Sequence, residues 1–213
     1  MWSDLEKGFQ LAFAEGWEAY KNDTIPIGVA ILDTEGNLMS TGQNQIFTAG
    51  SGLIQHHQLA HAEINAILKL SEINHPTIRE NIRTYTLYST MEPCPLCFGA
   101  IIMGSIRHLK YAARDTYAGA TAINDTLPYA QRKKITVTGP FPEAEMVQIA
   151  LQFEFELRRG RPHAVAVFRE TWGDICPKGI EIGQHLHDHH TLPNMADSEI
   201  QTVYDHIINL AKG

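Results

Sequence analysis

The chain has 213 residues, of which 44% are hydrophobic and 19% charged, so it carries enough apolar side chains for one substantial core. This composition excludes a disordered, collagen-like or coiled-coil chain. Its 17 Lys and Arg residues against 24 Asp and Glu give a formal net charge of -7, which argues against a nucleic-acid-binding protein, since such proteins usually present a basic face.

No stretch of the sequence approaches the roughly 18 apolar residues that a membrane span needs. The first residues, MWSDLEKG, carry acids where a secretory signal would be basic and then apolar. Three cysteines are too few for a disulfide framework, and Cys94 and Cys97 form a Cys-x-x-Cys pair that is typical of a metal or redox site in a reducing compartment. We therefore expect a cytoplasmic protein with no membrane partner.

The N-terminal part of the chain predicts a helix followed by a hairpin. Ser3 and Glu6 have the spacing of a capping box, and apolar residues at helical spacing predict a helix over residues 4–21. Residues 27–33 and 38–43 flank a turn that contains a Gly-Asn pair, which predicts two antiparallel strands.

The middle of the chain alternates between predicted helices and strands. Residues 60–73 place apolar side chains on one helical stripe, and His75-Pro76 is expected to end this helix. The elements expected after it are a strand at 83–90, a helix at 95–104, strands at 107–113 and 135–139, and a helix at 143–159. Such alternation is typical of a central sheet covered by helices.

The composition changes near residue 160. Residues 164–168 (AVAVF) fit an edge strand or an arm, and residues 173–196, which are rich in Gly, Pro and His, predict a loop or arm. Residues 198–211 predict an amphipathic helix that needs a surface to dock on. We therefore divide the chain into a domain over residues 1–160 and a C-terminal extension over residues 161–213.

Two short motifs carry the candidate chemistry: His-Ala-Glu at 61–63 and Pro-Cys-Pro-Leu-Cys at 93–97. If Pro95 opens a helix, Cys94 and Cys97 lie about one turn apart on one face and can bind the same Zn2+. A histidine from the first motif would supply the third ligand. Three protein ligands leave the fourth tetrahedral position for water, which is the arrangement of a catalytic site.

Glu63 is the candidate for a base beside this site. Two thiolates offset the formal charge of the zinc ion, so the bound water needs a nearby group to take its proton. Glu63 would accept that proton and later protonate the departing amine. Residues i and i+2 do not share a helix face, so His61 and Glu63 can converge only at the first turn of a helix.

These motifs match the H-x-E and P-C-x-x-C signature of zinc nucleobase deaminases. The chain resembles the cytidine/deoxycytidylate deaminase-like superfamily from about residue 5 to residue 159. Its stretches HAEINAI, LYSTMEPCPLCFGAIIMGSI and YAARD look like the branch that holds guanine deaminases and bacterial tRNA adenosine deaminases. The resemblance implies a three-layer α/β/α fold with a mixed five-stranded sheet, here followed by the C-terminal arm and helix. It also implies a homodimer.

The resemblance implies one zinc ion per subunit on His61, Cys94 and Cys97, with Glu63 as proton shuttle. The substrate contacts that follow from it are Asn44, Ala62 and Asp125. Asn44 can also be interpreted as a turn-ending amide, since Asn is common in turns. A remote alternative is a non-catalytic structural site closed by Cys176 as a fourth ligand.

The sequence thus predicts a zinc-dependent hydrolase that replaces an exocyclic ring amine by oxygen and releases ammonia. The acidic balance favours a small-molecule base or nucleoside as substrate. Adenosine-to-inosine editing of a tRNA is the alternative, and a tRNA partner is less expected because few basic residues are available for phosphates. The cluster of Arg158, Arg159 and Arg161 at a helix end is interpreted first as structural.

Overall fold

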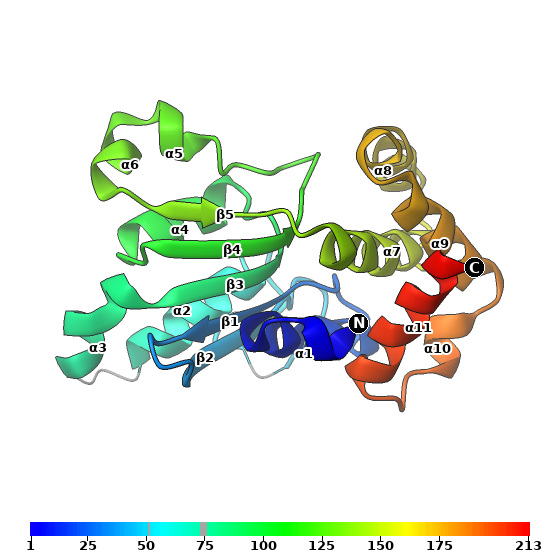
Figure 1. Cartoon of the computed structure of the whole chain (residues 1–213), viewed down its shortest axis with the longest axis horizontal. Coiled ribbons are helices and arrows are strands. Elements are labelled where there is room, and N and C mark those ends of the chain that lie inside the picture. The colour runs from blue at the N-terminus through cyan, green and yellow to red at the C-terminus, as the bar shows by residue number, and fades with distance from the viewer. Residues whose placement is uncertain (51, 73–75) are drawn as a thin grey trace.

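A mixed β-sheet runs through the centre of the computed structural model, which describes residues 1–50, 52–72 and 76–213 (Figure 1). Within these ranges its strands are β1 (Gly28–Leu32), β2 (Leu38–Gln43), β3 (Thr86–Met91), β4 (His108–Ala113) and β5 (Thr136–Thr138). Their spatial order is β2-β1-β3-β4-β5. β1 pairs antiparallel with β2 and β3, and β3, β4 and β5 run parallel. The predicted mixed five-stranded sheet is confirmed.

Helices cover both faces of this sheet. α1 (Lys7–Lys21) packs on β1 and β3, and α7 (Pro142–Arg158) packs on β4. On the other face α2 (Ala62–Glu72) packs on β2 and β1, and α4 (Pro95–Met103) contacts α2 (Figure 1). Because both faces are covered, every residue of β1 is buried. The three-layer arrangement is therefore the predicted one.

Short elements join these layers: η1 (Trp2–Asp4), α3 (Pro76–Asn81), η2 (Ile82–Thr84), α5 (Ile123–Thr126) and α6 (Pro128–Lys133). The helix predicted over 60–73 is observed as α2, whose last residue is Glu72. Its predicted end at His75-Pro76 falls partly on residues 73–75, which lie outside the described residues. Pro76 is the first residue of α3, a position where its missing N–H leaves no helical hydrogen bond unmade.

The predicted capping box at the first helix is not formed. α1 begins at Lys7, and its N-cap residue Glu6 makes no side-chain hydrogen bond to the helix. The Glu6 carboxylate instead accepts hydrogen bonds from Lys110 Nζ and from the Tyr88 hydroxyl, at 2.6 and 3.0 Å. The Glu6 carboxylate is thus bonded to side chains of β3 and β4 in place of the backbone N–H that a capping box would use.

The prediction of an edge strand or arm at 164–168 and of a loop or arm at 173–196 is wrong. These residues belong to α8 (Pro162–Ile175), α9 (Pro177–Asp188) and α10 (Thr191–Asn194). α8 and α9 each begin with a proline, whose fixed φ is suited to the first helical position. The Gly and His residues of α9 lower its intrinsic helix propensity, but burial of its apolar side against α7 outweighs that cost.

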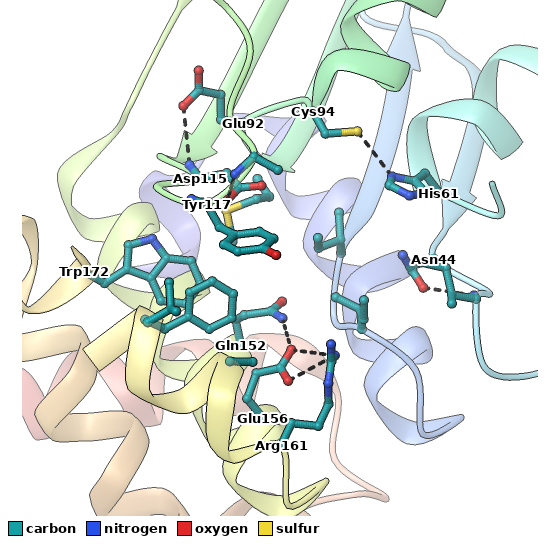
Figure 2. A pocket seen from close by; sticks show the side chains of 18 of the residues that line it. Asn44, His61, Glu92, Cys94, Asp115, Tyr117, Gln152, Glu156, Arg161 and Trp172 are labelled. Carbon is teal, nitrogen blue, oxygen red and sulfur yellow. Dashed lines mark hydrogen bonds and ion pairs between the residues drawn. The ribbon is translucent and has the colours of Figure 1, made fainter. Parts of the chain in front are cut away.

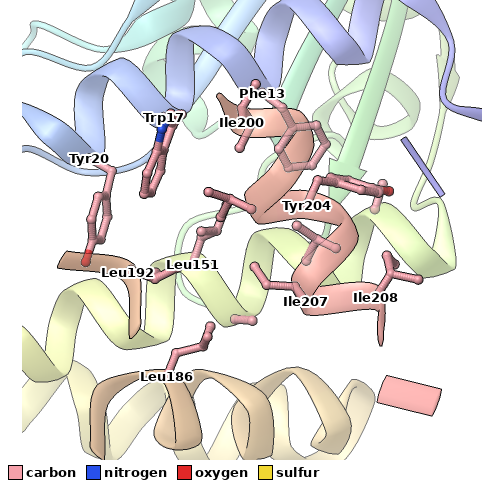
Figure 3. Packing of buried hydrophobic residues seen from close by; sticks show 14 of the residues in the cluster. Phe13, Trp17, Tyr20, Leu151, Leu186, Leu192, Ile200, Tyr204, Ile207 and Ile208 are labelled. Atoms are coloured by element: carbon pink, nitrogen blue, oxygen red, sulfur yellow. The ribbon is translucent and has the colours of Figure 1, made fainter. Parts of the chain in front are cut away.

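One apolar cluster joins α1 and α7 to the C-terminal helices (Figure 3). α11 (Ile200–Lys212) confirms the amphipathic helix predicted at 198–211, and it docks on α7, α9 and α1 of the same chain. Gly183 permits the close approach of α9 to α7, because an added Cβ would lie 2.9 Å from the backbone oxygen of Ala150. Fully buried members of the cluster include Phe13, Leu151, Leu186, Tyr204 and Ile207.

Candidate active site

Three potential metal ligands meet at the N-termini of α2 and α4. Among the residues that the structure describes, ligand atoms of His61, Cys94 and Cys97 lie within 4.8 Å of one another. His61 immediately precedes α2, Cys94 is the N-cap residue of α4, and Cys97 lies in the first turn of α4. Pro95 occupies the first helical position of α4, as expected from the motif. The fold therefore brings together the three residues that the motifs single out.

The spacing of these donor atoms fits a tetrahedral zinc site. His61 Nδ1 lies 3.6 Å from Cys94 Sγ and 3.4 Å from Cys97 Sγ. Zinc–sulfur bonds of about 2.3 Å and zinc–nitrogen bonds of about 2.0–2.1 Å, set at the tetrahedral angle, separate nitrogen and sulfur by about 3.5 Å. Thiolate and imidazole are also preferred zinc ligands. The residues present therefore fit one zinc ion per subunit.

The two cysteines of the ligand set differ in their pKa values. A hydrogen bond from Cys97, helped by His61, lowers the pKa of Cys94 to about 4, so this residue is a thiolate at neutral pH. The same contact and burial raise the pKa of Cys97. The thiolate is the form of cysteine that binds zinc, so Cys94 offers a charged ligand before the metal arrives.

Glu63 lies in the first turn of α2, and its side chain is buried, with 4% exposure. Burial raises the pKa of its carboxyl group, which the nearby His61 partly opposes. The Ser89 hydroxyl lies 3.4 Å from Glu63 Oε1 and donates a weak hydrogen bond to it. His61 precedes the first residue of α2, so its side-chain direction is not fixed by the helical repeat. Its imidazole can therefore lie near the Glu63 carboxyl group. The structure thus meets the condition set by the i, i+2 spacing.

His61, Glu63 and Cys94 line a cavity of about 420 Å³. Figure 2 shows this cavity with His61 and Cys94 labelled. This volume lies within the range of roughly 300–1,000 Å³ that is usual for small-molecule sites. Apolar side chains just before β1 and just after β2 form part of the wall: Ile25, Ile27 and Ile46. A mostly apolar wall with a few polar groups is typical of a pocket that binds a small molecule.

Asn44 lines this cavity from the end of β2 and is 2% exposed. Its Oδ1 accepts hydrogen bonds from Thr24 Oγ1 at 2.9 Å and from the Ile46 backbone N–H at 3.1 Å. Within the described residues no further hydrogen bond of the Asn44 amide is found. The oxygen is therefore committed to the protein, and Nδ2 is the group that can donate to a substrate.

Two further acidic residues on the cavity wall, Glu92 and Asp115, were not predicted from the sequence. Asp115 follows β4, and its Oδ1 accepts hydrogen bonds from the backbone N–H groups of Tyr117 and Ala118 at 2.9 and 3.0 Å. Burial raises the pKa of the Asp115 carboxyl group. The signal was available, because Asp115 ends the YAARD stretch directly after a motif strand, where parallel strands of such sheets place their ligand-binding groups.

α8 forms a further part of the cavity wall. Phe168 and Trp172 stack with ring centroids 4.1 Å apart, and Tyr117 meets Phe168 edge-on at 6.2 Å (Figure 2). Arg161 and His163 lie at the start of this helix and also line the cavity. Residues 164–168 were predicted to form an edge strand or an arm and residues 173–196 a loop or arm, so this helical wall could not be anticipated.

The structure does not bring the other two predicted substrate contacts to the cavity wall. Asp125 is exposed on α5 and is not among the residues that line the cavity. Ala62 is buried at the first position of α2 and packs in the apolar cluster below the sheet. The carboxylate that reaches the cavity from the chain after β4 is Asp115, ten residues earlier than the predicted one.

Cys176 does not join the metal ligands. It lies at the junction of α8 and α9, and the ligand group found among the described residues contains His61, Cys94 and Cys97 without it. This placement argues against the closed structural site that a fourth cysteine would form.

Comparisons with known proteins agree with this geometry. The family model of the cytidine and deoxycytidylate deaminase zinc-binding region matches residues 2–113. A guanine deaminase of Bacillus subtilis is 30% identical over 109 residues, which are 51% of this chain and 64% of that protein. A tRNA-specific adenosine deaminase of Haemophilus influenzae is 34% identical over 101 residues, which are 45% of this chain and 50% of that protein. The chain thus spans only part of both relatives.

Structural similarity supports the same fold. The guanine deaminase of Nitrosomonas europaea matches with a TM-score of 0.53 and 23% identity, over 70% of this chain and 82% of that structure. In the described part of the chain no helix combines the length and apolarity needed to cross a membrane. With the family model matching more than half of its length and the zinc ligand set in place, the chain belongs to the cytidine and deoxycytidylate deaminase zinc-binding family.

Proposed function

We propose that the protein is a zinc-dependent hydrolytic deaminase of a nucleobase, a nucleoside or a related aminated heterocycle, similar to guanine deaminases, and that it releases ammonia. One observation carries this proposal: the metal ligands His61, Cys94 and Cys97 lie beside the same cavity as the buried carboxyl group of Glu63. A homodimer in the cytoplasm is part of the proposal, on the basis of the family resemblance and the cysteine content.

The residues of the chain divide the proposed reaction between them. Zinc, when bound, would supply Lewis acidity to a water molecule. Glu63 would carry one proton of that water to a ring nitrogen and would then carry the second proton of the same water to the leaving amine, which departs as ammonia. Asn44 Nδ2 would donate to the substrate ring or sugar, and the apolar wall would exclude bulk water. Asp115 takes the position of a second acid in this proposal, in place of Asp125.

Editing of a tRNA adenosine remains the second candidate, because the Haemophilus relative carries that name at 34% identity. The charge arrangement favours the small molecule. Arg158 and Arg159 both pair with Asp23, at 2.9 and 2.6 Å, so neither guanidinium is free for a phosphate without breaking an ion pair. We expect turnover of a base or nucleoside to vary little with salt, since each phosphate contact would steepen the salt dependence.

Ammonia release by the zinc-loaded protein tests the proposal. The panel is guanine, adenine, cytosine, their nucleosides and a tRNA anticodon stem-loop. Glu63→Gln keeps the shape of the side chain and removes the base, so turnover should fall by about 10²–10⁴-fold while zinc content and substrate binding persist. Ser40→Ala, at a buried β2 position outside the cavity, is the control and should retain turnover. Undiminished turnover of Glu63→Gln would refute the shuttle role.

A further inference from the structure

α7 presents two polar side chains to the cavity. Gln152 and Glu156 are one helical turn apart and lie on the same face of the helix. Both line the cavity, and they are 4% and 2% exposed. Neither belongs to the zinc-binding motifs. A buried carboxylate and a buried amide on a cavity wall need a reason, because each loses its contacts with water.

Their hydrogen bonds leave two acceptor atoms unused. Gln152 Nε2 donates to Glu156 Oε1 at 2.9 Å. Arg161 lies 3.2 Å from Glu156 Oε2 as an ion pair, but its hydrogen bond goes to Oε1 at 3.4 Å. Within the described residues, Gln152 Oε1 and Glu156 Oε2 accept no hydrogen bond. Buried acceptors of this kind are rare in native proteins and are usually completed by water or a ligand.

The pair stands at the far end of the cavity from the metal ligands. Figure 2 shows the Gln152 amide pointing into the space between Tyr117 and Arg161, with Glu156 beside it. In the same view His61 and Cys94 lie at the opposite end. A substrate that places its reacting carbon near the metal ligands therefore extends its other end toward Gln152 and Glu156.

We propose that Gln152 and Glu156 form a recognition subsite for hydrogen-bond donors on the end of the substrate away from the reacting amine. The inference rests on the proposed deaminase function and names the substrate feature that this site selects. The donors come from one of two sources, the hydroxyl groups of a ribose or a second amino group on the ring. Both would donate to Gln152 Oε1 and Glu156 Oε2, the two oxygens that accept no hydrogen bond within the described residues.

The charge of this subsite also excludes a ligand class. A phosphate at this end of the cavity would meet the Glu156 carboxylate, and the cation beside it, Arg161, is already paired with Glu156. Like charges at close range in a partly dry cavity repel strongly. The subsite therefore selects nucleosides or amino-substituted bases over nucleotides.

Calorimetric binding tests the subsite, with Glu63→Gln introduced into the zinc-loaded parent protein and into each variant below, so that the ligands bind without appreciable turnover. The ligands are adenosine, 2′-deoxyadenosine, guanosine, adenine, 2,6-diaminopurine and adenosine 5′-monophosphate. Gln152→Met removes one acceptor at similar volume. Gln148→Met is the matched control, because Gln148 is a buried residue of the same helix that also has an unpaired Oε1 but does not line the cavity. Zinc content and circular dichroism check that each variant is folded.

Gln152→Met should weaken binding of the best ligand at least about 10-fold, and Gln148→Met should not. If Gln152→Met loses affinity for ribonucleosides only, the donors are ribose hydroxyl groups. If it loses affinity for 2,6-diaminopurine only, the donor is the second amino group of the ring. Glu156→Gln should reduce the ratio of nucleoside affinity to nucleotide affinity at least about 10-fold, because the negative charge that repels phosphate is removed. This second variant still tests the subsite if Gln152→Met does not fold. Equal binding by Gln152→Met and Gln148→Met, or no binding by the Glu63→Gln parent protein, overturns the subsite. Absence of ammonia from every compound with the unmodified protein would instead overturn the deaminase function while leaving a binding difference intact.

Discussion

The indole Nε1–H of Trp172 donates a hydrogen bond to the backbone oxygen of Arg114 at 3.0 Å, across 58 residues of sequence. Trp172 lies in α8 and is 1% exposed, and Arg114 directly precedes Asp115 on the cavity wall. The bond therefore ties the C-terminal extension to the loop that carries the second acid. Residues between 161 and 172 form part of the cavity wall, although they lie outside residues 5–159, the stretch that resembles the deaminase family.

Trp172→Phe removes this bond while keeping an aromatic ring against Phe168. We expect the free energy of unfolding to fall by about 1–3 kcal/mol, because the buried oxygen of Arg114 loses its partner. Urea denaturation followed by circular dichroism measures the change. Trp2→Phe is the control, since no hydrogen bond of the Trp2 indole N–H is found within the described residues, and it should cost less. An equal loss in both variants would show that ring size, not the hydrogen bond, sets the stability.

Cys94→Ser should lose the metal. Serine is a poor zinc ligand beside one thiolate and one imidazole, so the zinc content should fall from about one ion per chain toward zero. Thermal stability should fall with it, because metal binding contributes to folding. Zinc content is measured by atomic emission after dialysis. Cys176→Ser is the matched control and should retain its zinc, whereas zinc loss in that variant would revive the closed structural site.

Two glycine substitutions should have opposite effects on stability. Gly42 in β2 faces α2 so closely that an added Cβ would overlap the backbone oxygen of Ala62. Gly42→Ala should therefore lower the free energy of unfolding by about 1–3 kcal/mol and disturb the start of α2, next to His61. Gly173→Ala, in α8 with nothing within 4 Å of an added Cβ, should raise it by about 0.5–1 kcal/mol. Denaturant unfolding of both variants measures these shifts, and a stabilised Gly42→Ala would contradict the packing argument.

Glu154 should make stability depend on pH. It is 1% exposed, accepts a hydrogen bond from the Tyr20 hydroxyl at 2.7 Å, and faces Arg158 and His187 at 3.9 and 4.0 Å. Burial outweighs these partners and raises the pKa of Glu154 above its usual 4.5. Between the unfolded and folded pKa values the native state binds more protons, so its stability falls as the pH rises from about 4.5.

Replacing this carboxyl group isolates its contribution. Relative to the unmodified protein, Glu154→Gln should gain stability as the pH rises from 4.5 to 7.5, because it has no charge to bury. Urea denaturation at several pH values measures the difference in free energy of unfolding between the two proteins. The contributions of the other buried acids are common to both proteins and cancel in this difference. The exposed Glu170→Gln is the matched control. A difference that shrinks with rising pH would show that Arg158 and His187 dominate over burial.

The sheet, the covering helices and the zinc ligands could be predicted from sequence because their signals are local. Alternating strands and helices identify the layers, and Pro95 sets the phase of α4 so that Cys94 and Cys97 share one side of its first turn. His61 and Glu63 could be paired with them because the motif spacing is typical of one kind of metal site. These inferences need a few residues of neighbouring chain and no knowledge of long-range packing.

The C-terminal helices and the cavity wall depended on tertiary contacts. The Gly and His residues of α9 oppose a helix locally, and only burial against α7 decides in its favour. Asp115 rather than Asp125 lines the cavity because the chain after β4 turns there, where the Asp115 carboxylate caps the backbone N–H groups of Tyr117 and Ala118. The sequence by itself determined the chemistry of the metal centre, since ligand type and short spacing specify it. Which side chains surround the substrate was decided by helices far apart in the chain that pack together, and no local pattern encodes that contact.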